Sequence, residues 1–261
     1  MEGHMSMKRM AMPAAVLLVA AASMAAIGAD SRETTSTCAT VIGSEVCTWV
    51  VMEGGDPVEL GATVPMALVE SVPLDAEMVW PPRELATIPL PEEARRTLGL
   101  DHLGINWEAH GHPPATFVTP HFDFHFYNVD AAAVAAIDCA DASKPAALPD
   151  GYALPDIEVP EMGTFVGLCV PKMGMHAMPS DEVHQTNPFG ASMMVGYYRA
   201  QPIFLEPMVS RDLLLARKDF SLAVPPVSGL PEGVRYPTGF RAEHDEGSDE
   251  YRLVFTGFGS G

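Results

Sequence analysis

The segment His121–Tyr127 constrains the fold of this chain more than any other, because its side chains alternate in character at every position. It reads His-Phe-Asp-Phe-His-Phe-Tyr. Successive side chains of an extended strand point to opposite faces, so the phenylalanines would share one face. The other face would carry His121, Asp123 and His125. The pattern predicts a strand with one face in a hydrophobic core and the opposite face made of imidazole and carboxylate groups.

Prolines and glycines interrupt the rest of the chain. The sequence contains 24 prolines and 22 glycines in 261 residues, which predicts short elements and many loops. Strands are predicted at 48–52, 58–69, 117–129, 164–170, 192–198, 203–207 and 251–258, and helices at 91–98, 131–137 and 211–219. The few helices do not alternate regularly with strands, which disfavours a doubly wound α/β fold. We expect a β-rich α+β fold with an antiparallel sheet or barrel-like core and a few short helices.

The N-terminal segment has the layout of a secretory signal peptide. A short basic stretch precedes residues 13–27, which are almost entirely Ala, Val, Leu and Met, and small residues follow up to Ala29. The apolar run of about 15 residues is shorter than the roughly 20 that a membrane span needs, although an uncleaved anchor is the alternative. We expect residues 1–29 to be removed and residues 30–261 to form one β-rich globular domain. The mature protein would be periplasmic or secreted, without a membrane contact.

The charge of the chain is strongly acidic. Thirty-four Asp and Glu residues against 15 Lys and Arg residues give a formal net charge of −19. This excess argues against nucleic acids and anionic membranes as partners. We therefore expect a small-molecule substrate and no nucleic-acid partner.

The four cysteines predict disulfide bonds. An even number of cysteines in an exported chain favours disulfides, and three pairings are possible. The preferred pairing joins Cys38 to Cys47 and Cys139 to Cys169, closing one short and one longer loop. A thiolate metal site is the alternative, but the sequence contains no Cys-x-x-Cys motif.

The histidines are concentrated near the alternating segment. Five of the nine lie between His102 and His125. Neutral imidazoles beside a carboxylate suit zinc, copper, iron or nickel. However, His121 and His125 would lie about 13 Å apart along a straight strand, too far for one ion with bonds of about 2.0–2.1 Å. The segment is therefore expected to form one wall of a site that other segments complete.

Other segments supply the remaining candidate ligands. His110 and His112 flank a glycine, so both could approach one ion, and His176 follows a glycine-containing turn. The expected pool of metal ligands, of which three would be used, is His110, His112, His121, His125 and His176. Asp123 and Glu206 are expected to orient or deprotonate water. Alternatively, Asp123 is a ligand or orients a ligand imidazole, and Glu206 is a ligand or the partner of an arginine.

Zinc is the expected metal and copper is the alternative. Three methionines, Met173, Met175 and Met178, flank His176, and thioethers favour Cu(I). The chain contains 16 methionines, however, and most are expected to pack in the core.

Three motifs resemble those of a family of exported bacterial proteins. They are Pro-His-Phe-Asp-Phe-His-Phe-Tyr at 120–127, Pro-x-Met-Gly-x-His at 171–176 and Phe-Leu-Glu-Pro-Met at 204–208. The family is similar to an envelope-stress-regulated protein that assembles into a large ring-like homo-oligomer. The resemblance runs from about residue 58 to 219 and includes His-Gly-His-Pro-Pro at 110–114; the turn at 177–180 departs from the Trp-containing segment of relatives. It implies export and a homo-oligomer, and it transfers no activity.

These observations support three hypotheses of function. In the first, a zinc ion with an open coordination position lowers the pKa of water toward about 7, and the protein is a hydratase with carbonic-anhydrase-like chemistry or a hydrolase. In the second, it is a non-catalytic periplasmic metal-binding protein or an envelope-stress oligomer. In the third, the histidines form a buried polar network or a pH-responsive surface in a structural oligomer without metal. No Gly-x-Ser-x-Gly motif supports a serine hydrolase.

Overall fold

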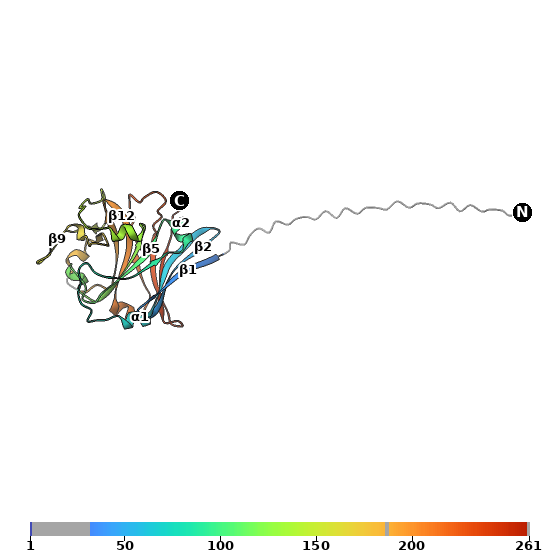
Figure 1. Ribbon diagram of the computed structural model, residues 1–261, viewed down its shortest axis with the longest axis horizontal. Helices are drawn as coiled ribbons and strands as arrows, with labels where there is room; N and C mark the ends of the chain where they lie inside the picture. The colour runs from blue at the N-terminus through green and yellow to red at the C-terminus, as the bar shows by residue number, and fades with distance from the viewer. Residues whose placement is uncertain (2–31, 186–187, 260–261) are drawn as a thin grey trace.

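The computed structural model of the chain describes Met1, residues 32–185 and residues 188–259, and within them two open antiparallel sheets (Figure 1). The first sheet has the order β1 (Arg32–Val41), β2 (Ser44–Glu53), β3 (Asp56–Pro65), β15 (Glu250–Thr256), β14 (Gly239–Asp245) and β13 (Phe220–Ala223). The second has the order β4 (Glu84–Pro89), β5 (His102–Glu108), β6 (His121–Tyr127), β12 (Gln201–Ser210), β11 (Ala191–Tyr198), β10 (Met175–Pro179) and β7 (Tyr152–Ala153). The strands β8 (Ile157–Val159) and β9 (Gly163–Phe165) form a separate hairpin.

The helices are short and lie at the ends of strands. They are α1 (Met66–Ser71), α2 (Glu92–Leu98), α3 (Ala131–Ala135) and α4 (Arg211–Leu215), with 3-10 turns η1 (Ala115–Phe117), η2 (Val166–Leu168) and η3 (Glu182–His184). Side chains cap two of them, because Asp130 accepts a hydrogen bond from the Ala133 amide and Ser210 accepts one from the Leu213 amide. No helix in the described ranges has the length and apolar character of a transmembrane span.

The predicted fold class is confirmed, although neither sheet closes into a barrel. Several predicted boundaries are wrong. The strand expected at 117–129 begins only at His121, because residues 115–117 form η1. The strand expected at 58–69 ends at Pro65 and continues as α1. The strand expected at 164–170 turns into η2, since Gly167 adopts a positive φ of 59°. The helix expected at 211–219 ends at Leu215, and Arg217 has a φ of 50°. The predicted signal peptide lies outside the described residues.

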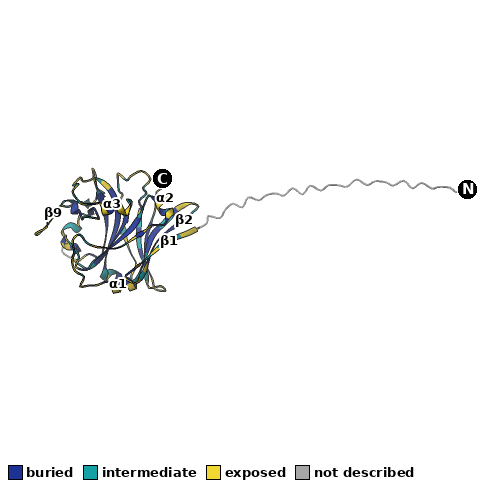
Figure 2. Ribbon diagram, viewed as in Figure 1, coloured by how far each residue is buried: buried dark blue, intermediate teal, exposed yellow. Residues whose placement is uncertain are grey.

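The aromatic face of β6 lies in the core between the two sheets. Phe122, Phe124 and Phe126 are buried in the same cluster as residues of β2, β3 and β15. The Phe126 ring meets Phe255 of β15 edge to face, with centroids 5.0 Å apart. Burial of each such side chain contributes roughly 1.5–3 kcal/mol. Figure 2 shows the buried strands of both sheets in the centre of the molecule. The opposite face of β6 therefore points away from the first sheet.

Both predicted disulfides are present. Cys38 and Cys47 join opposite positions of β1 and β2, and Cys139 and Cys169 tie the segment after α3 to the end of η2. Disulfides form and persist in oxidising compartments, so the two bonds are consistent with an extracellular or periplasmic protein.

Candidate metal centre

The polar face of β6 is as deeply buried as its aromatic face. His121, Asp123 and His125 are 0%, 3% and 0% exposed. Their shared side confirms the predicted alternation. Because burial removes these groups from water, each polar atom needs a partner within the protein or a bound ion.

The first group of potential ligands comprises His112, His121 and Asp123, and we call it the outer group. One ligand atom from each residue lies within 4.8 Å of the other two. His121 Nε2 and Asp123 Oδ1 are 3.2 Å apart, but neither atom has a hydrogen-bond partner. His112 comes from the loop before η1 and places its ring edge-on to His121, with centroids 4.9 Å apart.

The second group comprises His125, His176 and Glu206, all buried, and we call it the inner group. Glu206 Oε2 lies 3.6 Å from His125 Nε2 and 3.8 Å from His176 Nε2. Both distances exceed those of normal hydrogen bonds. His125 Nε2 and Glu206 Oε2 have no hydrogen-bond partner. Three donor atoms therefore surround a common point without bonding to one another.

Pairing between strands assembles the inner group. The antiparallel register of β6 and β12 pairs Phe126 with Leu205, so the next pair in that register is His125 and Glu206. His176 arrives from the other side, since β10 pairs with β11 and β11 pairs with β12. Residues from three distant parts of the sequence thus meet on one face of the second sheet.

The Phe204 ring holds the two imidazoles of the inner group in place. Its centroid lies 4.8 Å from that of His125 and 5.2 Å from that of His176. The ring occupies the space over Gly196, where an added Cβ would lie 2.0 Å from Phe204 Cε1. A glycine at position 196 is therefore required for this packing.

Backbone carbonyls fix the orientation of three imidazoles. The Nδ1 atoms of His112, His121 and His176 lie 2.8, 2.7 and 3.0 Å from the carbonyl oxygens of Pro113, Thr119 and Leu168. A carbonyl oxygen only accepts, so each Nδ1 carries a proton, and in the neutral form of each ring Nε2 keeps its lone pair for the site. Metal-binding histidines usually donate a hydrogen bond from their other ring nitrogen to such an acceptor. His125 differs, because neither of its ring nitrogens has a hydrogen-bond partner.

Burial keeps most of these imidazoles neutral. It lowers the pKa of His125 to about 3 and that of His112 to about 4, and it lowers the pKa of His176 as well. Burial acts in the same direction on His121, but Asp123, the Thr119 carbonyl and Glu108 together outweigh it and raise the pKa of His121. Neutral imidazole is the form that binds metal ions.

Three acidic side chains share this site without a lysine or arginine partner. Burial raises the pKa of Glu206 well above its ordinary value and that of Glu108 to about 8, and repulsion from Asp123 adds to both. Burial opposes ionisation of Asp123 too, but His121 lowers its pKa. Among the described residues, the ion-pair partners of Asp123 and Glu206 are histidines, and neither Lys nor Arg pairs with any of the three acids. A bound cation would supply the missing positive charge.

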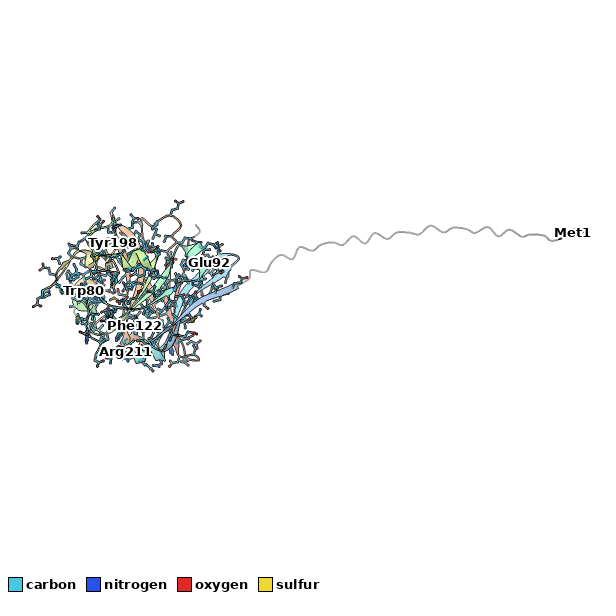
Figure 3. The ribbon with its side chains drawn as sticks, viewed as in Figure 1. Met1, Trp80, Glu92, Phe122, Tyr198 and Arg211 are labelled. Carbon is cyan, nitrogen blue, oxygen red and sulfur yellow. A yellow bond between two sulfur atoms is a disulfide. The ribbon has the colours of Figure 1, made fainter. Side chains whose placement is uncertain are left out.

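Both groups face one cavity of about 290 Å³. Its polar lining consists of Glu108, His110, His112, Asp123, His176 and Glu206. Its walls are otherwise apolar and include Trp80, Phe117, Phe165, Met194 and Met208. In Figure 3, Trp80 lies on the opposite side of the molecule from Glu92 of α2. The cavity is a small, apolar chamber that carries ligand groups at its buried end.

The structure distributes the predicted ligands over two groups rather than one. The spacing along β6 explains the division, because His121 and His125 fall into different groups. His110 lies outside both, is exposed, and places its Nε2 3.0 Å from the Ala76 carbonyl oxygen. Asp123 and Glu206, expected to act on water or to serve as ligands, each belong to one of the two groups of potential ligands.

Two further features bear on the predictions. Met175 and Met178 pack in hydrophobic clusters, whereas Met173 lines the cavity. Glu108 was not predicted as a site residue. Its only sequence signal is an acidic side chain directly after the mostly apolar stretch 103–107.

Searches of protein-family models, curated proteins and solved structures find no match for this chain. The resemblance to exported oligomeric proteins therefore stays a prediction. The two groups of potential metal ligands are the evidence for function.

Proposed function

We propose that the protein is an exported zinc-dependent enzyme that activates water to hydrolyse or hydrate a small, largely apolar substrate. The observation that carries the proposal is the inner group, in which His125, His176 and Glu206 converge without hydrogen bonds between them. Catalytic zinc sites use three protein ligands and leave a position open, whereas structural sites use four. Three converging ligands therefore favour catalysis over storage.

The chemistry of the ligands supports zinc over copper. Both groups offer two imidazoles and one carboxylate, a set found in catalytic zinc sites. Sulfur ligands select Cu(I), and the methionines Met175 and Met178 are engaged in packing. The same ligand set also occurs in iron(II) oxygenases, so the test must identify the metal.

The cavity supports an apolar substrate larger than carbon dioxide. Its volume of about 290 Å³ lies near the lower end of small-ligand pockets. Four of its lining side chains are large, apolar and exposed: Met78, Trp80, Val118 and Met162 are 75%, 47%, 59% and 47% exposed. Exposed apolar side chains gathered at one opening are typical of binding sites. Ester cleavage therefore fits the cavity better than carbon dioxide hydration.

Different residues would bind the metal, transfer protons and bind the substrate. His125, His176 and Glu206 would hold the metal, and the carbonyl of Leu168 fixes the tautomer of His176. A bound zinc ion supplies water with a pKa lowered toward about 7. Glu108 lines the same cavity outside both ligand groups, opposite His121, and we assign to it the acceptance of a proton during the reaction. The apolar walls hold the substrate and exclude bulk solvent.

The test measures metal content and ester hydrolysis in protein purified without a His tag. We expect zinc in the isolated protein and cleavage of short acyl esters of 4-nitrophenol that stops after chelation and returns with zinc. His125→Ala should lose both. His184→Ala, which removes an exposed histidine outside both groups, should retain both.

Three results would contradict the proposal. Iron or copper in place of zinc would refute the metal assignment. A stable metal-free protein would refute metal dependence. A metal-loaded protein without activity toward esters or carbon dioxide would favour the alternative, a non-catalytic metal-binding protein of the cell envelope.

The resemblance to exported bacterial proteins also leads us to propose a homo-oligomer. Light scattering on the purified protein tests this separately. A monomer at micromolar concentration would contradict it without affecting the metal site.

A further inference from the structure

We propose that the outer group, His112, His121 and Asp123, binds a second divalent metal ion, so that two ions face the same cavity. The first ion belongs to the inner group, and this part of the inference rests on the proposed function. The outer group has evidence of its own, which concerns its geometry, its charge and its place in the cavity.

The geometry of the outer group is that of an independent site. Its three ligand atoms lie within 4.8 Å of one another, as do those of the inner group. Carbonyl oxygens bind Nδ1 of both His112 and His121, which leaves both Nε2 atoms for a ligand. His121 Nε2 and Asp123 Oδ1 are buried without hydrogen-bond partners. The two atoms lie 3.2 Å apart without the geometry of a hydrogen bond, so an ion between them would satisfy both.

The two groups are neighbours on one strand. Asp123 and His125 point to the same side of β6 and are two residues apart, which corresponds to about 7 Å along a strand. Asp123, His112, His176 and Glu206 all line the single cavity described above. One substrate in that cavity would therefore lie within reach of both ions.

The charge of the site calls for more than one cation. Glu108, Asp123 and Glu206 place three acidic groups around the cavity, and no lysine or arginine among the described residues forms an ion pair with them. Bound cations favour the ionised form of nearby carboxyl groups, and if all three are ionised, one divalent ion leaves a net negative charge. Two divalent ions give four positive charges against three negative ones, which leaves an affinity for an anion or a polarised oxygen of the substrate.

A two-metal arrangement would divide the reaction between the ions. A separation of about 7 Å along the strand exceeds the roughly 3.5–4 Å between ions that act on the same attacking and leaving oxygens, so the inner ion would activate water and the outer ion would bind a separate oxygen of the substrate. The substrate class would then be an ester, with that oxygen at the outer group and its apolar part against the methionine and aromatic walls.

Metal stoichiometry tests the second site without depending on activity. Tag-free protein would be stripped with a chelator, loaded with excess zinc, desalted and analysed for metal per chain. We expect two ions in the unaltered protein and in the control His184→Ala. His121→Ala and Asp123→Asn should each retain one ion, at the inner group. His125→Ala should also retain one, at the outer group. Circular dichroism and thermal unfolding would establish that each variant is folded, and His121→Gln or His125→Gln replaces the corresponding alanine variant if that variant is not.

The outcomes separate the two proposals. One ion in the unaltered protein that is lost in His125→Ala and kept in His121→Ala would overturn the second site and leave the proposed function standing. If the unaltered protein binds one ion and both His125→Ala and His121→Ala lose it, the two groups form a single shared site. That result would also overturn the second site. No bound ion in any loaded protein would overturn both.

Discussion

The two faces of β6 are both buried, yet one packs against apolar side chains and the other buries polar atoms without hydrogen-bond partners. The phenylalanine face packs between the sheets, where each ring meets other apolar side chains. The opposite face buries His121, Asp123 and His125 beside the cavity, with ring nitrogens and a carboxylate oxygen that lack hydrogen-bond partners. Burial alone therefore does not distinguish a core from a site. The clustering of unpaired polar atoms does, because native proteins rarely leave several such atoms together without partners.

The difference has an energetic consequence. Each buried phenylalanine contributes roughly 1.5–3 kcal/mol to stability, whereas each unpaired buried polar atom costs about 1–3 kcal/mol. One face of the strand should thus support folding, and the other should depend on a bound ion. Changes to the two faces are expected to have different effects.

The largest effect is expected from Phe124→Ala. The ring of Phe124 is fully buried in the core between the sheets. Its removal should lower the free energy of unfolding by about 3–5 kcal/mol, as measured by urea denaturation. The variant that remains folded should bind as much zinc per chain as the unaltered protein. A loss below about 1 kcal/mol would refute the role given to this face, since that is far outside the range for such a cavity.

Removal of metal should destabilise the protein, because the polar atoms on the histidine face of β6 would lose their bound ion. At a free zinc concentration 100 times the dissociation constant, binding adds about 2.7 kcal/mol to the free energy of unfolding. Thermal unfolding with and without a chelator measures this difference. The same chelator should destabilise Glu206→Gln by less than the unaltered protein, because this variant has already lost the ion of the inner group. Equal stabilities of the unaltered protein in both conditions would contradict the comparison between the faces.

Glu206→Gln should separate binding from folding. We expect the affinity for zinc at the inner group to fall about 100-fold or more, since even residues that only orient ligands cost 10–100-fold. The metal-free variant should keep its stability to within about 1 kcal/mol, because burial raises the pKa of Glu206 and already favours the neutral carboxyl group, which glutamine resembles. Isothermal titration and denaturation measure the two quantities. An unchanged affinity would exclude Glu206 as a ligand.

The smallest effect is expected from Gly196→Ala. The added methyl group would meet the Phe204 ring, which packs on His125 and His176. Such overpacking typically costs about 1–3 kcal/mol of stability, and we expect it to weaken zinc binding about 10-fold. Gly190→Ala is the matched control, because its methyl group would meet Leu213 at an ordinary 3.6 Å. Equal zinc affinities in the two variants would show that Phe204 does not position the imidazoles.

The sequence predicted the local features of this site and missed the long-range ones. The alternation in β6 depends only on neighbouring residues, so it identified both faces. The caps at Asp130 and Ser210 and the two disulfides were likewise predictable. The division into two groups was not, because Glu206 reaches His125 only through the register between β12 and β6.

Other misses have a similar cause. Glu108 reaches the cavity because β5 pairs with β6, which brings it opposite His121. Neither strand shows this partner in its own sequence. The turn at Gly167 depends on a left-handed conformation that a single glycine permits but does not require.

Anomalous diffraction from crystals of the zinc-loaded protein tests the central claim most directly. Data collected above and below the zinc absorption edge locate zinc without reference to activity or stability. We expect a peak within bonding distance of His125 Nε2, His176 Nε2 and a carboxylate oxygen of Glu206, at about 2.0–2.2 Å from each. A map without a peak between these three side chains, from crystals grown with zinc, would contradict the claim that they form a metal site.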